Sequence, residues 1–192
     1  MKKIFFYLLL LCPLAYAETT PEKTPATTPE PCYKVGMVLA PLTECANKGD
    51  AIAQNNLGLM YLQGQGVAKD DKTAFEWLSK AAKQNQSDAQ NALGVIYEKG
   101  YGVPVDTTKA FEWYSKAAEQ GDSTAQFKLG LMYHMGCGVP QDHVLRYMWF
   151  NLAVAHGNAD AIKFKAITLK AMTPDQIDKA QKKSMEWLAK HS

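Results

Sequence analysis

The sequence predicts an all-α fold, a solenoid of helix–turn–helix repeats of about 36 residues. The first observation behind this prediction is that many residues recur with that spacing. They include Ala53, Ala89 and Ala125; Leu57-Gly58, Leu93-Gly94 and Leu129-Gly130; Tyr61, Tyr97 and Tyr133; and Trp77, Trp113 and Trp149. The second is that the apolar residues of each copy follow helical spacing. The third is a Gly-x-Gly-Val segment within each copy, which is typical of a turn between two helices.

The first half of each copy predicts a helix with one buried stripe. In the first copy, Ala53, Leu57 and Tyr61 lie four residues apart, so they share one side of a helix. Gly58 lies beside this stripe, although a glycine costs a helix roughly 1 kcal/mol relative to alanine. Because a glycine recurs there in all three copies, we expect a neighbouring helix to approach too closely for a side chain.

The second half predicts another helix, which begins at an aspartate. Asp70 follows the Gly-x-Gly-Val turn, as Asp106 and Asp142 do in the next copies, and aspartate is a favoured N-cap. Each second helix then carries an apolar stripe, which in the first copy comprises Ala74, Trp77, Leu78 and Ala81. We expect each tryptophan to fill the wedge between repeats. The helical spacing of the tryptophans and tyrosines favours this core role over a sugar-binding ladder.

The chain divides into a signal, a tether and a repeat domain. Residues 1–17 have the pattern of a secretory signal peptide with a cleavage motif at Ala15-Tyr16-Ala17, so the mature chain would begin at Glu18. Residues 18–31 are rich in threonine and proline and predict a disordered tether. Residues 32–192 are predicted to form the repeat domain. An uncleaved membrane anchor and a lipid-modified Cys12 are the alternatives. The apolar run is shorter than the roughly 20 residues that span a bilayer, so we expect no membrane span after cleavage.

The repeat domain is predicted to contain complete and incomplete repeats. An opening half-repeat covers residues 37–52, three full repeats cover residues 53–88, 89–124 and 125–160, and a modified capping repeat covers residues 161–191. In the capping repeat, Thr173, Pro174 and Gln176 replace the glycine turn and predict a capping box at the start of the last helix. A departure at this end suits a terminal repeat, because its outer face meets water.

Charge and motif content exclude several classes of function. The chain carries 21 basic and 19 acidic residues, and cleavage removes Lys2 and Lys3, so the mature protein is neutral. We therefore expect no nucleic-acid partner. The four histidines lack zinc-ligand spacing, and the Gly-x-Gly segments follow helices and not strands, so we expect no metal and no cofactor. No catalytic residues can be assigned, and a cell-envelope hydrolase is the competing functional class.

The mature chain keeps three cysteines, Cys32, Cys45 and Cys137. Export implies an oxidising compartment in which disulfides persist, and an odd number leaves one thiol over. We predict a disulfide between Cys32 and Cys45, because they are consecutive cysteines in the mature sequence and the loop between them is short. Cys137 lies between two turn glycines, so we expect it to be exposed and either free or paired between molecules. Three free thiols are the alternative.

The repeated motif resembles that of the Sel-one-like repeat (SLR) family, a relative of the tetratricopeptide repeats. The motif reads A-x-A-Q-x-x-L-G-x-x-Y-x-x-G-x-G-V, followed by D-x-x-x-A-x-x-W-x-x-x-A-A. The segment from Met172 to Gln181 also resembles the closing segment of exported bacterial members. This resemblance implies a right-handed α-solenoid that acts as a scaffold or adaptor. Some members carry a disulfide within each repeat, and this sequence lacks those pairs.

Together these features predict an exported module that binds a protein or peptide on its concave face. A secreted effector that binds host proteins is the runner-up. If Ala53, Leu57 and Tyr61 face inward, the opposite side of the first helices should face the groove. The residues assigned to it are Asn55, Leu59, Leu62 and Gln63; Asn91, Val95, Glu98 and Lys99; and Phe127, Leu131, His134 and Met135. The last set contains an apolar stripe, which suits an anchor site. Alternatively, the first helix of the capping repeat covers that stripe.

Overall fold

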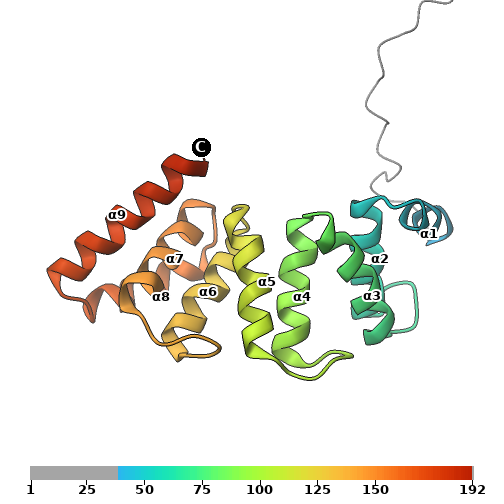
Figure 1. The fold of residues 1–192 in the computed structure, drawn as a ribbon, viewed down its shortest axis with the longest axis horizontal. Helices are drawn as coiled ribbons and strands as arrows, with labels where there is room; N and C mark the ends of the chain where they lie inside the picture. The colour runs from blue at the N-terminus through green and yellow to red at the C-terminus, as the bar shows by residue number, and fades with distance from the viewer. Residues whose placement is uncertain (1–38, 192) are drawn as a thin grey trace, which may run out of the picture. The chain divides into compact units, whose positions relative to one another are not determined.

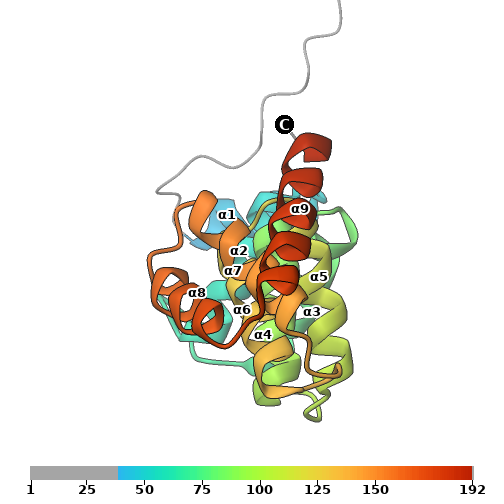
Figure 2. The ribbon, with the colours of Figure 1, turned by 90° about the vertical axis from the view of Figure 1, so that its left-hand side faces the viewer.

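The computed structural model describes residues 39–191, which form nine α-helices and no strand. In chain order the helices are α1 (Leu39–Asn47), α2 (Ala51–Gln63), α3 (Asp71–Lys83), α4 (Ser87–Lys99), α5 (Thr107–Glu119), α6 (Ser123–Met135), α7 (His143–Ala155), α8 (Asp160–Lys170) and α9 (Pro174–His191). Helices α2 to α7 pack against one another in chain order, as Figures 1 and 2 show, so the predicted all-α solenoid is confirmed. The predicted signal peptide, tether and Cys32 lie outside the described residues.

The helices of each repeat begin and end where their capping residues place them. Asp70 accepts hydrogen bonds from the backbone N–H groups of Lys72 and Thr73, and Asp106 and Asp142 cap the next two second helices in the same way. The first helices end at Gly64, Gly100 and Gly136, whose φ angles of 69°, 75° and 74° lie in the left-handed region. Glycine adopts this conformation without strain, which explains the repeated turn.

The recurrent glycine of each first helix meets a buried side chain of the following helix. A Cβ built on Gly58 would lie 2.6 Å from Cγ of Leu78, and one built on Gly94 would lie 2.5 Å from the ring of Tyr114. Gly130 faces Phe150 in the same manner. The expected close approach of helices is therefore confirmed.

The prediction that each tryptophan fills the wedge needs correction. Leu78, Tyr114 and Phe150 each follow a tryptophan, and these three residues are almost fully buried at the glycine contact. Trp149 is buried in the core as predicted, with 7 % of its surface exposed, but Trp77 and Trp113 are only half-buried. These two each lie with a lysine ammonium group over the ring, Lys80 and Lys116 respectively. In the first two repeats the second helix is rotated so that the residue after the tryptophan points at the first helix, while the tryptophan lines the edge of the junction.

A buried glutamine joins each repeat to the one before it. Gln90 is 2 % exposed, and its amide donates to the backbone carbonyl of Ala82 in the preceding repeat. Its side-chain oxygen accepts a hydrogen bond from Gln120, which caps the second helix of its own repeat. Gln54 and Gln126 repeat this arrangement, with Gln84 and His156 as the respective partners. The glutamine of the sequence motif is thus a polar link between three helices.

The C-terminal helices depart from the repeat. The predicted capping box is present, because Thr173 and Gln176 exchange side-chain to backbone hydrogen bonds of 3.0 and 3.4 Å. However, α9 does not pair with α8 as the second helix of a full repeat would, and both α8 and α9 pack against α7. Trp187 of α9 donates a hydrogen bond to Glu119 at the end of α5. The last helix therefore folds back over the preceding repeats.

Candidate binding groove

The residues assigned to the binding face fall into two groups. The first lies under neighbouring helices. Asn55 is 3 % exposed, and Phe127 packs its ring against Phe150 and Phe164, with ring centroids 5.8 and 5.3 Å apart. Leu131 packs against the same apolar cluster. Phe164 belongs to α8, so this helix covers Phe127 and Leu131. This is the alternative stated above, in which the first helix of the capping repeat covers the apolar stripe. Asn91, Leu59, Leu62 and Val95 are half-buried at the junctions between repeats.

The second group lines a groove between α4 and α6. Its cavity has a volume of about 260 Å³ and is lined by Glu98, Lys99, Thr107, Ala110, Lys128, Leu131, Met132, Met135 and Cys137. Four of these residues, Glu98, Lys99, Leu131 and Met135, belong to the predicted set, and Leu131 contacts both the groove and the cluster of Phe127 and Phe150. Met135 is 56 % exposed, so its side chain is accessible at the groove. Gln63 and His134 are exposed outside this cavity.

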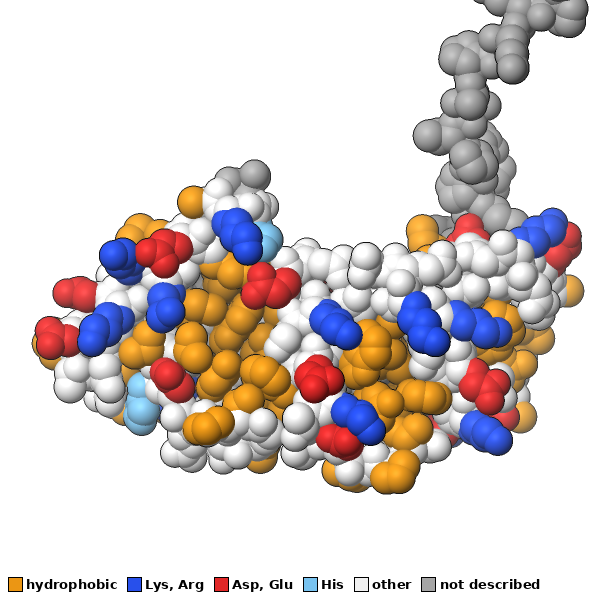
Figure 3. All heavy atoms as spheres, in the orientation of Figure 1, with side chains coloured by type: hydrophobic (Ala, Val, Ile, Leu, Met, Phe, Trp, Pro, Cys, Tyr) orange, Lys and Arg blue, Asp and Glu red, His pale blue; other side chains and the backbone are white. Residues whose placement is uncertain are grey.

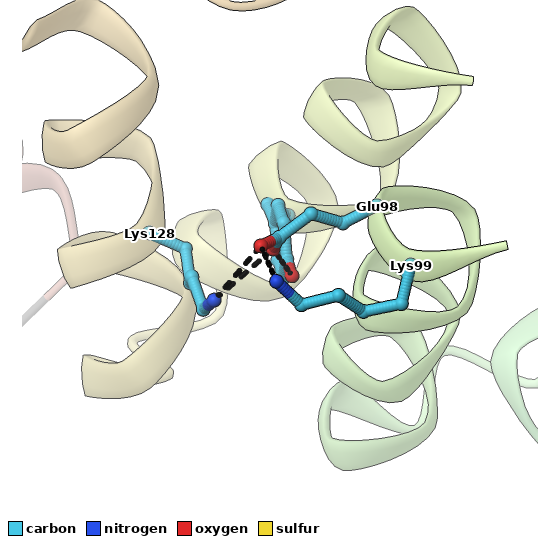
Figure 4. Close-up of polar contacts among 4 residues, drawn as sticks. Glu98, Lys99 and Lys128 are labelled. Carbon is cyan, nitrogen blue, oxygen red and sulfur yellow. Dashed lines mark hydrogen bonds and ion pairs between the residues drawn. The ribbon is translucent and has the colours of Figure 1, made fainter. Parts of the chain in front are cut away.

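A charged cluster forms one wall of the groove (Figure 4). Glu98 lies between Lys99 of its own helix and Lys128 of α6. Its carboxylate is 3.0 Å from the ammonium group of each lysine and accepts a 2.6 Å hydrogen bond from the hydroxyl of Tyr114. Two lysines and one glutamate leave the cluster with a net positive charge. Carboxylate groups of a ligand would therefore be attracted to this wall.

The protonation of this cluster follows from its contacts. Burial alone would raise the pKa of Glu98, but hydrogen bonds from Tyr114, Lys128 and Lys99 outweigh it and lower the pKa to about 2. Burial, together with the bond to Glu98, raises the pKa of the Tyr114 hydroxyl. Glu98 is thus ionised and Tyr114 is neutral at physiological pH, and the cluster has a fixed charge.

Comparison with known proteins places this arrangement in a family. The family model of the Sel1 repeat matches residues 51–86, 87–122 and 123–158. The chain belongs to the Sel1 repeat family. Each matched repeat begins two residues before the boundary expected from the sequence, with the same period. The matched family is defined by its repeat and indicates no catalytic activity. No curated protein sequence matches the chain significantly.

Three solved structures are similar to the chain. A protective antigen of uropathogenic Escherichia coli with an SLR fold shares 38 % identity over 79 % of this chain, with a TM-score of 0.74. A Sel1 repeat protein from Oxalobacter formigenes shares 35 % identity over 62 %, with a TM-score of 0.61. Helicobacter pylori cysteine rich protein B shares 27 % identity over 67 %, with a TM-score of 0.55. The chain spans 32 %, 48 % and 98 % of these proteins, respectively.

The groove depends on two residues in which the Sel1 repeats differ. Cys137 stands where the previous repeat has Tyr101, whose ring packs against an apolar cluster together with Leu62. Ala110 stands where the next repeat has Arg146. At the central junction both positions carry small side chains, so space remains between α4, α5 and α6.

Arg146 fills the equivalent space one repeat later. Its guanidinium group donates to Nδ1 of His134 at 2.7 Å and to Nδ1 of His143 at 3.0 Å. These histidines correspond in register to Glu98 and Thr107, which line the open groove. Arg146 is 8 % exposed, and burial lowers the pKa of its guanidinium group. His134 and His143 are thus hydrogen-bond acceptors for a buried arginine.

The sequence reasoning missed Thr107, Ala110, Lys128, Met132 and Cys137 as groove residues. Lys128 is aligned with Ala92 in the preceding repeat, and Glu98 is aligned with Leu62. Two charged residues that replace apolar ones at adjacent positions of neighbouring first helices were the available signal. The pattern within one helix does not reveal this pair, because Glu98 of α4 and Lys128 of α6 meet only across the junction between repeats.

The described part of the chain also bears on a metal site, a membrane span and the cysteines. Within residues 39–191, no group of three or more His, Cys, Asp or Glu side chains is placed to hold a metal ion, and no helix has the length and hydropathy needed to cross a membrane. Cys137 is a free thiol and is half-buried in the groove, so it is less exposed than expected. Cys45 is 3 % exposed. The predicted pairing of Cys45 with Cys32 remains a prediction.

Proposed function

We propose that this chain is an exported protein-interaction module, and that the groove between α4 and α6 receives a segment of its protein partner. The proposal rests on the central junction, where Cys137 and Ala110 leave a cavity that larger side chains occupy at the neighbouring junctions. Membership of a family of helical repeats supports a binding role, because stacked repeats present extended surfaces for partners.

The chemistry of the groove defines the segment. Met132, Met135 and Leu131 offer an apolar floor, and methionine side chains adapt to varied partners. Lys99 and Lys128 supply positive charge that Glu98 only partly neutralises. The partner segment therefore places an apolar side chain on the floor and an acidic group beside Lys99.

Site-directed photo-crosslinking in the native cell tests this assignment. A photo-reactive residue at position 135 should capture a partner, whereas the same residue at position 185 should not. Met185 is the matched control, because it is a methionine with 63 % exposure on α9, compared with 56 % for Met135. Lys99→Glu should abolish the adduct at position 135 and keep the helical circular dichroism of the wild type. Equal adducts at both positions, or an adduct that Lys99→Glu leaves intact, would place the binding site elsewhere.

Export is tested separately. The predicted signal peptide of residues 1–17 supports it, and N-terminal sequencing of the mature protein should begin at Glu18. Fractionation should recover the protein in the periplasm. Recovery in the medium would favour the secreted effector, and an unprocessed N-terminus would contradict cleavage.

A further inference from the structure

Helix α8 is a first helix without its second helix. In the three matched repeats, α2, α4 and α6 each pack against the helix that follows them. Position 166 continues the row formed by Gly58, Gly94 and Gly130, and alanine there is again small. Yet α9, which follows α8, packs against α7. The side of α8 that corresponds to the helix-pairing side of α2 therefore lacks this contact.

This side of α8 is apolar. Ile162, Ala166 and Leu169 lie at helical spacing on one face and are all exposed, Ile162 by 58 % and Leu169 by 39 %. Their counterparts in the first repeat, Gln54, Gly58 and Tyr61, contact α3 through Gln84, Leu78 and the apolar cluster that includes Trp77. The residues that bind a second helix elsewhere in the molecule are thus apolar and solvent-exposed here.

The charge around this stripe indicates its occupant. The exposed positions of α8 carry Lys163 and Lys170 against Asp160, whereas the ammonium group of Lys165 lies over the ring of Tyr147 on α7. Residues 160–191 as a whole contain seven lysines and four acidic residues, and Figure 3 shows lysines and acidic groups together over α9. Two copies of α8 facing each other in a symmetric dimer would bring lysines against lysines, which is unfavourable. An acidic partner would instead be attracted.

We propose that the exposed side of α8 docks an amphipathic helix with acidic flanks from a partner protein, in the manner in which α3 lies on α2. Ala166 permits close approach of the two backbones, and Ile162 and Leu169 contact the apolar stripe of the incoming helix. The last repeats of a solenoid usually present a polar outer face, so the exposed apolar side chains of α8 are expected to have a function, which a docked helix would supply. This surface is separate from the groove between α4 and α6.

A stapled peptide provides the probe. It carries the α3 sequence, residues 71–83, with Lys72→Glu, Lys80→Glu and Lys83→Glu, and its binding to the mature protein is measured by fluorescence anisotropy. The peptide should bind, and affinity should fall as salt concentration rises. Ala166→Lys should weaken binding by about tenfold or more, since a long charged side chain then blocks the contact. A peptide with lysines in place of its acidic residues should bind the wild-type protein no more tightly than the acidic peptide binds Ala166→Lys.

Control variants make the outcome decisive. Ala166 is exposed, so Ala166→Lys should keep the helical circular dichroism and melting temperature of the wild type. Met135→Glu, in the groove, should leave peptide binding unchanged. Absence of peptide binding, or binding that Ala166→Lys does not alter, would overturn the proposal. A dimer in sedimentation equilibrium that Ala166→Lys dissociates would show that a second copy occupies α8, and would also overturn it.

Discussion

A glycine is needed in the middle of each first helix because a buried side chain of the next helix occupies the space of a Cβ atom. Gly94 leaves room for the ring of Tyr114, whose side chain is fully buried and whose hydroxyl reaches Glu98. The same residue thus fills the junction between helices and holds the charged wall of the groove. Packing and charge at the groove are linked through one side chain.

Gly94→Ala should destabilise the protein. The new methyl group would overlap the Tyr114 ring, and overpacking of this kind costs about 1–3 kcal/mol, which exceeds the roughly 1 kcal/mol that alanine contributes to helix propensity. Chemical denaturation measures the change. The double-mutant cycle with Tyr114→Ala is the control, since removal of the ring should remove the penalty. If Gly94→Ala lowers the free energy of unfolding equally in the Tyr114→Ala background, contact with the ring is not the reason for a glycine at position 94.

The ion pairs of Glu98 predict a pH-dependent contribution to stability. The pKa of Glu98 is about 2 in the folded protein, compared with the ordinary value of 4.5 for a glutamate. Because the folded pKa is lowered, the stabilisation is complete above about pH 4.5 and is lost as the pH falls towards 2. Glu98→Gln should lower the free energy of unfolding at pH 7 by about 1–2 kcal/mol.

Urea denaturation at pH 7, 5 and 3 tests this behaviour. The difference between wild type and Glu98→Gln in the free energy of unfolding should be the same at pH 7 and pH 5 and smaller at pH 3. Glu44→Gln is the matched control, because Glu44 forms an exposed pair with Lys48 on α1 and exposed pairs contribute little. A difference that is constant with pH would show that the charge of Glu98 is not responsible.

At the scale of helices, the buried glutamines join neighbouring elements. Gln126 is fully buried and connects α6 to the carbonyl of Ala118 and to His156 at the end of α7. Replacement by leucine keeps the volume but removes both side-chain bonds, although the carbonyl of Ala118 still accepts from the backbone N–H of Gly121. Gln126→Leu should therefore cost about 1–3 kcal/mol, measured by urea denaturation. Gln181→Leu, on the exposed side of α9, should change stability by less than about 0.5 kcal/mol. Equal effects of the two changes would contradict the structural role.

The helices and their limits were predictable from the sequence because they depend on local chemistry. Asp70 and its counterparts cap the second helices, and Thr173 with Gln176 forms the expected capping box. The side that each helix buries was less predictable. Trp113 and Tyr114 are adjacent and both apolar, and the rotation that buries the tyrosine is decided by Gly94 on another helix. The groove was only partly predicted for the same reason, since Lys128 and Glu98 meet across a junction.

At the scale of the whole molecule, the cysteines divide into two classes. Cys137 is a free thiol at the groove, and Cys45 of α1 is buried against α2. We predict that Cys45 pairs with Cys32, which would tie the segment before α1 to the opening half-repeat. Alkylation of the unfolded protein without reductant, followed by mass spectrometry, should label Cys137 alone. Labelling of all three mature cysteines would refute the pairing.

The position of α9 also belongs to this scale, and the sequence did not predict it. Met185 to Lys190 resembles Phe75 to Lys80 of a second helix, and the second helices of the matched repeats pack against the first helix before them. The structure instead holds Trp187 against Glu119 and His156. These contacts join residues that no local pattern relates, so they depend on the curvature of the repeats that precede them.

The glutamine links have a consequence for the order in which the chain folds. The amide of each buried glutamine bonds a carbonyl 8 residues earlier, and its oxygen bonds a partner 30 residues later. A chain that emerges N-terminus first therefore completes each junction once about one more repeat has followed, and such short-range contacts favour rapid folding. The bond from Trp187 to Glu119 spans 68 residues, so it cannot form until α9 has been synthesised. Before that point the growing protein adds repeats to a folded end, and the contact of α9 with the earlier repeats follows them.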